Sequence, residues 1–206
     1  MPSPRPPLRL GFLASHGGSN LQAILDAIAA GSLPAEARLV ICNNSDAKAL
    51  QRARAVGVPG LHLSTRTHGD ADTLDRAMAA ALREHGVELV VCAGYMRRVG
   101  PRVLAGFPRR VLNVHPALLP RFGGEGMWGL HVHEAVLAAG ERVTGVTVHL
   151  VDAVYDHGAI LAQAEVPVLP GDTPEALQAR VLATEHRLYP ETLRRIALGE
   201  IDLDAV

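Results

Sequence analysis

The chain has 206 residues, of which 48% are hydrophobic and 20% are charged. This composition is typical of a globular protein and argues against a disordered or membrane-embedded chain, and the length allows a substantial core. The 20 Lys and Arg residues are balanced by 21 Asp and Glu residues. No basic surplus is therefore present to hold nucleic acid or an anionic membrane, and any anion has to be bound at a local site.

Two features bear on the cellular compartment. A proline-rich start is followed by an apolar segment, residues 8–13, that is too short for a signal core or a membrane span. Cys42 and Cys92 each end an apolar run, which favours buried, reduced thiols over a disulfide framework. We therefore expect a cytoplasmic protein.

Strand-like and helix-like segments alternate along the first half of the chain. We predict strands at residues 8–13, 38–42, 61–63 and 89–92, and helices at residues 21–30, 47–56 and 71–85. This alternation is typical of right-handed βαβ units. The predicted fold is α/β, with a doubly wound, mostly parallel central sheet and helices on both faces.

A glycine-rich turn joins the first strand to the first helix. It contains Gly17, Gly18, Ser19 and Asn20. Free N–H groups and the positive end of the helix dipole would make this turn a site for phosphate. An equally simple interpretation is a tight turn with Ser19 or Asn20 as the helix N-cap. The turn matches neither the dinucleotide fingerprint nor a Walker loop.

The segment from Val111 to Pro120 changes from strand chemistry to site chemistry within a few residues. Asn113 and His115 alternate with β-forming apolar residues, so both leave the same face of the strand. Pro116 then ends the strand, and ligands bind at the carboxyl ends of parallel strands. An imidazole and an amide there can transfer a proton and stabilise an oxyanion. Alternatively, His115 is simply hydrogen-bonded to a backbone carbonyl.

The remaining segments complete the predicted order. Residues 121–129 contain four glycines and Trp128, and we expect a mobile loop. His131 and His133 have metal-ligand spacing, but they precede a predicted helix and lack a third ligand, so we expect no metal. Strands are predicted at residues 142–151 and 159–168, with Asp156 in the turn between them. The last helix, residues 175–198, carries Glu185, by default on its solvated face.

Five segments closely resemble phosphoribosylglycinamide formyltransferases, the folate-dependent enzymes of purine synthesis. They are Gly18-Ser19-Asn20-Leu21-Gln22-Ala23-Ile24, Ala93-Gly94-Tyr95-Met96-Arg97, Asn113-Val114-His115-Pro116-Ala117-Leu118-Leu119-Pro120, Asp156-His157-Gly158 and Glu185-His186-Arg187-Leu188-Tyr189-Pro190. The resemblance covers residues 8 to about 203, in order and at matching spacing. It implies a single formyltransferase domain over residues 1–206, with a Rossmann-like, phosphate-binding half at about 8–110 and a catalytic and folate-binding half at about 111–203.

The resemblance also implies the site residues. The catalytic trio is Asn113, His115 and Asp156. The substrate phosphate falls on Gly18, Ser19 and Asn20, and its ribose falls on Glu185. The folate contacts fall on Met96, Arg97, Arg98, Val99, Asn113, Asp152, Ala153, Val154, Tyr155 and Asp156.

The implied activity is transfer of the formyl group of 10-formyltetrahydrofolate, a cosubstrate, to the amine of glycinamide ribonucleotide. We expect small-molecule substrates, no metal, and a monomer or homodimer. Two alternatives stay open: a 10-formyltetrahydrofolate hydrolase, and a non-catalytic sugar-phosphate-binding module. This chain departs from the family pattern at a folate-tail contact, where only Arg66 is nearby, at Ala159, and in a longer loop between Arg121 and Leu130.

Overall fold

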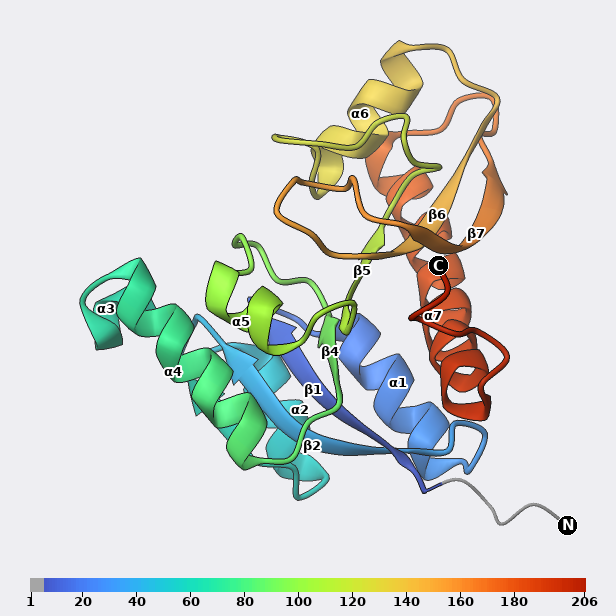
Figure 1. Ribbon diagram of the computed structural model, residues 1–206. Helices are drawn as coiled ribbons and strands as arrows, with labels where there is room; N and C mark the ends of the chain where they lie inside the picture. Colours follow the sequence, from blue (N-terminus) through green and yellow to red (C-terminus); the bar gives the residue numbers. More distant parts are fainter. Residues whose placement is uncertain (1–5) are drawn as a thin grey trace, which may run out of the picture.

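The computed structural model describes residues 6–206. Its strands are β1 (Leu8–Ala14), β2 (Ala35–Cys42), β3 (Gly60–His62), β4 (Leu89–Cys92), β5 (Val111–His115), β6 (Val143–Leu150) and β7 (Ile160–Pro167). Its helices are α1 (Ser19–Ala29), α2 (Lys48–Ala55), α3 (Thr65–His68), α4 (Ala71–Glu84), α5 (Pro101–Gly106), α6 (Leu130–Ala138) and α7 (Pro174–Leu198). Figure 1 shows the alternation of strands and helices through the first half of the chain.

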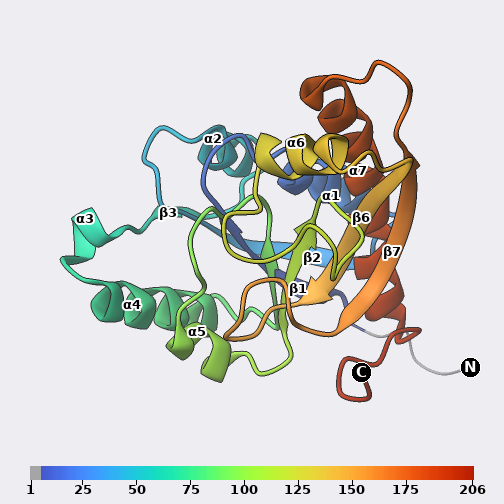
Figure 2. The ribbon, with the colours of Figure 1, turned by 90° about the horizontal axis from the view of Figure 1, so that it is seen from above.

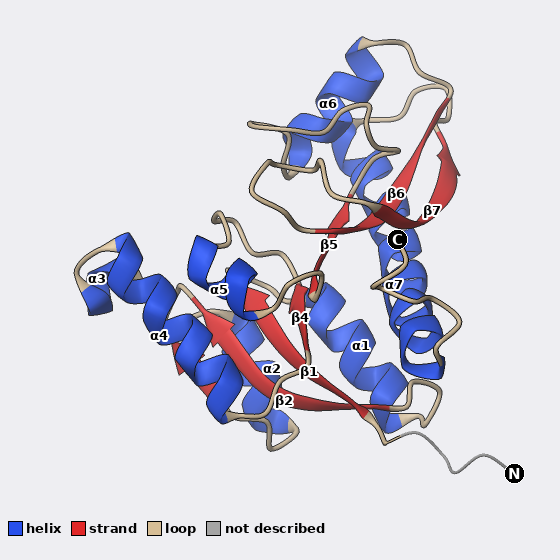
Figure 3. Cartoon of the chain, viewed as in Figure 1, coloured by secondary structure: helices blue, strands red, loops and turns tan. Residues whose placement is uncertain are grey.

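The described strands form one sheet in the order β3-β2-β1-β4-β5-β6-β7. Strands β1 to β5 pair in parallel, which confirms the predicted α/β fold with a mostly parallel sheet. Strand β6 pairs antiparallel with β5, and β7 pairs antiparallel with β6. These two strands extend the sheet beyond β5, as Figure 3 shows. The sequence prediction had assigned no direction to these two strands.

Helices cover both faces of the sheet (Figure 2). One face packs against α1, α2, α6 and α7, and the other packs against α4 and α5. The sequence prediction missed α3 and α5, which are too short to display a helical period. Within residues 6–206, no helix is long and apolar enough to cross a membrane.

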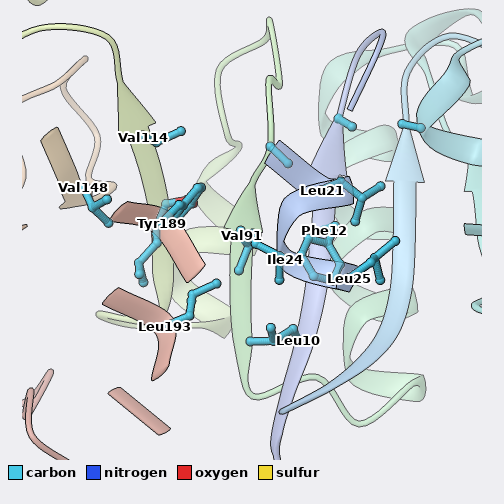
Figure 4. Packing of buried hydrophobic residues seen from close by; sticks show 14 of the residues in the cluster. Leu10, Phe12, Leu21, Ile24, Leu25, Val91, Val114, Val148, Tyr189 and Leu193 are labelled. Atoms are coloured by element: carbon cyan, nitrogen blue, oxygen red, sulfur yellow. The ribbon is translucent and has the colours of Figure 1, made fainter. Parts of the chain in front are cut away.

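The core on the α1 face joins the two halves of the chain. Figure 4 shows side chains of β1, β4, α1 and α7 pointing toward one another, among them Phe12, Ile24 and Tyr189. The Tyr189 hydroxyl donates to the carbonyl oxygens of Cys92 (3.2 Å) and Leu112 (3.1 Å), on the neighbouring strands β4 and β5. Helix α7 is therefore fixed to the centre of the sheet.

The carboxyl ends of β1, β4 and β5 lie side by side, because these strands are neighbours and parallel. Two hydrogen bonds connect the loops that follow β1 and β4: Ser15 N donates to Gly94 O (3.1 Å), and Met96 N donates to Ser15 Oγ (2.8 Å). The glycine-rich turn, the Met96 turn and His115 therefore lie at one edge of the sheet. Cys42 and Cys92 are buried and unpaired, as predicted.

Candidate active site

Strands β5 and β6 place four polar side chains on one face of the sheet. Asn113 and His115 are two residues apart on β5, and the antiparallel register sets them opposite His149 and Thr147 of β6. Asp156 follows β6, in the loop before β7, where its φ of 53° is in the left-handed region. The structure thus brings Asn113, His115 and Asp156 together from segments more than 40 residues apart in the printed sequence.

The Asp156 carboxylate lies between two imidazole rings. Its Oδ2 atom is 3.5 Å from His115 Nδ1, and its Oδ1 atom is 3.5 Å from His149 Nε2. Gly124 N also donates to Oδ2, at 2.9 Å. Burial raises the pKa of Asp156, but these rings and the Gly124 N–H outweigh burial and hold it below its usual value. Asp156 is therefore ionised at neutral pH.

Opposing effects act on His115. Burial lowers the pKa of His115, and the charge of Asp156 and a hydrogen bond with Phe122 counteract part of this change. Nδ1 faces the Asp156 carboxylate, and Nε2 is 2.7 Å from the Phe122 carbonyl oxygen. Both ring nitrogens face acceptors, and only the protonated imidazole donates from both. The hydrogen-bond geometry at His115 suits the cation, but burial outweighs it and holds the pKa of His115 below its usual value.

His149 is a site residue that the sequence analysis missed. Its Nδ1 atom is 2.8 Å from the Leu150 carbonyl oxygen, so this nitrogen carries the hydrogen. Nε2 lies 3.3 Å from the Asn113 amide nitrogen and 3.5 Å from Asp156 Oδ1, so it accepts from Asn113 when the ring is neutral and donates to Asp156 when the ring is protonated. The Asn113–His149 bond uses one of the two amide N–H groups, and among residues 6–206 the other has no acceptor in the protein. Strand alternation places His149 on the same face as Thr147, but only the β5–β6 register sets it opposite Asn113.

The glycine-rich turn forms the start of α1. Gly18 is the N-cap, with φ of 64°, and no side chain caps the helix, so the alternative with Ser19 or Asn20 as N-cap is wrong. A Cβ atom on Gly18 would lie 2.9 Å from Ala49 Cβ. Because the first N–H groups of a helix lack intrahelical acceptors, those of Ser19 and Asn20 are available to an anion.

The side chain of Asn20 turns toward α7. Its amide nitrogen donates to Glu185 Oε2 at 2.6 Å, and both residues are buried. Burial raises the pKa of Glu185 to about 7. The expected solvated position of Glu185 is therefore wrong: this carboxyl faces the α1 N-terminus because α1 packs on α7. The phosphate and ribose candidates thus form one connected group.

The two candidate folate segments are also connected. Arg98 donates to the Ala153 carbonyl oxygen, and its guanidinium lies 5.8 Å from the centre of the Tyr155 ring. Met96, Val154 and Tyr155 on these two segments are exposed large apolar side chains. Asp152 shapes its own loop by accepting from Val154 N at 2.7 Å.

A cavity of about 910 Å³ opens beside the folate candidates. Arg97, Arg98, Val99 and Ala153 line it together with Arg66 of α3 and residues of α4. Its size is in the range of ligand sites. Asn113, His115 and Asp156 do not line it. The cavity therefore extends from the folate segments toward α3 and α4 and away from the catalytic candidates.

The two histidines with metal-ligand spacing diverge. Helix α6 begins at Leu130, so His131 and His133 lie inside it and not before it as predicted. His131 is exposed beside Trp128, with 4.9 Å between ring centres, whereas His133 is buried. Burial, and secondarily His115, lowers the pKa of His133 to about 4. Residues two positions apart on a helix do not face the same point.

The family model, the relatives and the solved structures that match this chain all point to one family. A family model described as "Formyl transferase" matches residues 8–193. The phosphoribosylglycinamide formyltransferase of Mycobacterium tuberculosis is 43% identical, over 94% of this chain and 87% of that protein. The chloroplastic phosphoribosylglycinamide formyltransferase of Arabidopsis thaliana is 41% identical over 91% of this chain, which spans only 65% of that relative. The solved glycinamide ribonucleotide transformylase 1 from Symbiobacterium toebii is 46% identical, with a TM-score of 0.88, and the match covers 94% of this chain and 89% of that one.

Proposed function

Because this chain belongs to the formyl transferase family, we propose that it transfers the formyl group of 10-formyltetrahydrofolate to the amine of glycinamide ribonucleotide. The product is formylglycinamide ribonucleotide, an intermediate of purine biosynthesis. The observation that carries this proposal is the placement of Asp156 between His115 and His149, with Asn113 bonded to His149. An oxyanion donor, a proton carrier and a carboxylate that tunes it are therefore in contact.

The reaction needs these three roles. The neutral amine attacks the formyl carbon, a C–N bond forms, and the carbonyl oxygen becomes an oxyanion. Asn113 donates its free N–H to this oxygen, and protonated His115 stabilises the negative charge. When the intermediate collapses, the bond from the formyl carbon to N10 of the folate breaks. Protonated His115 gives its proton to N10, and the neutral ring then takes the proton that the attacking amine loses. Asp156 orients His115 and favours its cation.

The Phe122 carbonyl bears on this mechanism. It lies 2.7 Å from His115 Nε2, where a substrate oxygen would otherwise accept. Phe122 belongs to the loop of residues 121–129, and its φ of 56° is unusual for a bulky residue. We infer that substrate binding shifts this loop and releases Nε2. The glycines of this loop led us to expect that it is mobile, and its movement would free His115 Nε2 for the substrate.

The substrate sites follow from the same arrangement. The phosphate binds to the N–H groups at Gly18, Ser19 and Asn20, and Glu185 contacts the ribose. The folate lies against the Met96–Val99 turn and residues 152–156, which Arg98 joins. A single domain with a phosphate-binding half and a catalytic half accounts for both, because one sheet contains β1 to β7.

The chemistry requires neither a metal nor a covalent nucleophile. Cys92 is unsuited to nucleophilic attack, since burial raises its pKa to about 12. The hydrolase alternative shares the catalytic trio but has no need of the α1 phosphate site. The non-catalytic module would use that site but would leave the arrangement around Asp156 without a purpose.

The test is the rate of tetrahydrofolate formation by purified protein, with and without glycinamide ribonucleotide. We expect the rate to depend on the ribonucleotide. An equal rate in its absence would identify a hydrolase. Binding of both compounds without turnover would support the non-catalytic module.

A further inference from the structure

Helix α2 contacts the loop before α1 at three points. Ala49 N donates to His16 O at 3.1 Å, and Arg52 Nε donates to Gly17 O at 2.8 Å. Gly18 packs on Ala49 so closely that a Cβ atom would come within 2.9 Å of Ala49 Cβ. Two successive carbonyl groups of the loop therefore point toward α2.

These contacts determine the direction of the N–H groups in the same peptides. The peptide bonds of this loop are trans. In a planar trans peptide, the N–H of one residue points opposite to the C=O of the residue before it. The N–H groups of Gly17 and Gly18 consequently point away from α2. Within residues 6–206, neither N–H group has a hydrogen-bond acceptor in the protein.

Arg52 is itself held in place. Its Nη1 atom donates to Gln22 Oε1 at 2.7 Å, one turn into α1. The guanidinium therefore spans the carbonyl before the helix and a side chain on the helix. Its charge also reaches α7, where it adds to burial in lowering the pKa of His186. A cationic donor on the Gly17 carbonyl polarises that peptide and makes the Gly18 N–H a stronger donor.

We propose that Arg52 is a positioning residue of the phosphate site, which orients and polarises the Gly17–Gly18 peptide so that Gly18 N–H faces the substrate phosphate. The inference rests on the proposed function and extends it to a residue of α2. Arg52 does not itself contact the phosphate in this account, because its guanidinium lies on the carbonyl side of the peptide. Its effect is therefore specific to phosphorylated ligands.

The test compares Arg52→Met with Arg54→Met, since Arg54 is an exposed arginine of the same helix. For Arg52→Met, we expect the KM for glycinamide ribonucleotide to rise about 10-fold, the loss typical of one charge-assisted hydrogen bond. kcat and the KM for the folate donor should change by less than about twofold. Arg54→Met should match the wild type.

Two further measurements separate positioning from other roles. With the dephosphorylated substrate, Arg52→Met should show no added loss. Arg52→Lys keeps the charge but not the planar donor pair, so it should restore activity only in part. An equal loss with both substrates would assign Arg52 to general stability, and full rescue by lysine would assign it to bulk charge. Either result would overturn the inference.

Calorimetric titration with ribose 5-phosphate gives a readout that is independent of turnover. The wild type and Arg54→Met should bind it alike, and Arg52→Met should bind it about 10-fold more weakly. Equal binding by all three proteins would refute the role of Arg52, even if the wild type formylates the ribonucleotide. Weaker binding by Arg52→Met in a protein that transfers no formyl group would instead refute the proposed function alone.

Discussion

Replacing Asp156 by asparagine removes the negative charge from the site and nearly preserves its shape. The carboxylate raises the pKa of His115 against the larger effect of burial. Without it, the pKa of His115 falls further, and less of the active cation is present at any neutral pH. Activity that needs protonated His115 is lost as pH rises through its pKa. The high-pH limb of the kcat profile should therefore move to lower pH in Asp156→Asn.

The distance between the two groups sets the size of the effect. His115 Nδ1 and Asp156 Oδ2 are 3.5 Å apart, and both side chains are largely buried. Opposite charges about 4 Å apart attract by about 4 kcal/mol at an effective dielectric constant of about 20. Each ~1.4 kcal/mol corresponds to a factor of ten in rate. We expect kcat to fall by roughly 10²- to 10³-fold near neutral pH.

Steady-state kinetics from acid to alkaline pH measure this effect, and circular dichroism and a melting curve verify that the variant is folded. Glu165→Gln is the matched control, because Glu165 is an exposed carboxylate on β7. Its profile should coincide with that of the wild type. A folded Asp156→Asn variant with an unshifted profile and nearly normal kcat would refute the role assigned to Asp156.

Four other predictions follow from the same site. His115→Ala should lower kcat by about 10²-fold or more without unfolding the protein; near-normal turnover would remove His115 from the mechanism. The fluorescence of Trp128, which is 57% exposed, should change when glycinamide ribonucleotide or a folate analogue binds, and an unchanged spectrum at saturation would argue that the loop stays fixed. Gly18→Val combines a positive φ with a clash against Ala49, so the KM for the ribonucleotide should rise at least about 10-fold while that for folate stays within about twofold; equal weakening would point to misfolding. Glu185→Gln should raise the unfolding free energy by up to about 3 kcal/mol at pH 8 and by little at pH 4. Between pH 4.5 and about 7 the carboxyl ionises in the unfolded chain before it ionises in the folded one, so its burial destabilises the fold increasingly as the pH rises. Urea unfolding that shows the same change at both pH values would contradict this.

The parallel part of the fold was predictable because its signals are local. Apolar runs such as residues 89–92 predict buried strands, and helical periods between them predict crossovers. The α6 boundary was misplaced because Gly129 and Leu130 gave no capping signal before His131. The direction of β6 and β7 depends on pairing between distant segments, to which local periodicity is blind.

Part of the candidate site was also predictable from the sequence. Asn113 and His115 could be placed at a strand end from alternation alone, and resemblance supplied Asp156 and Glu185. His149 could not be found, because its contact with Asn113 depends on the β5–β6 register. The burial of Glu185 depends on the packing of α7 on α1, and no helical pattern distinguishes such a carboxyl from a solvated one.

Formyl transfer moves one carbon atom, and labelling that atom tests the proposed reaction most directly. Purified protein is given 10-formyltetrahydrofolate with ¹³C in the formyl group, together with glycinamide ribonucleotide, and the products are followed by NMR. We expect one labelled formamide on the ribonucleotide for each tetrahydrofolate formed. Label recovered as formate, with the ribonucleotide unchanged, would contradict it.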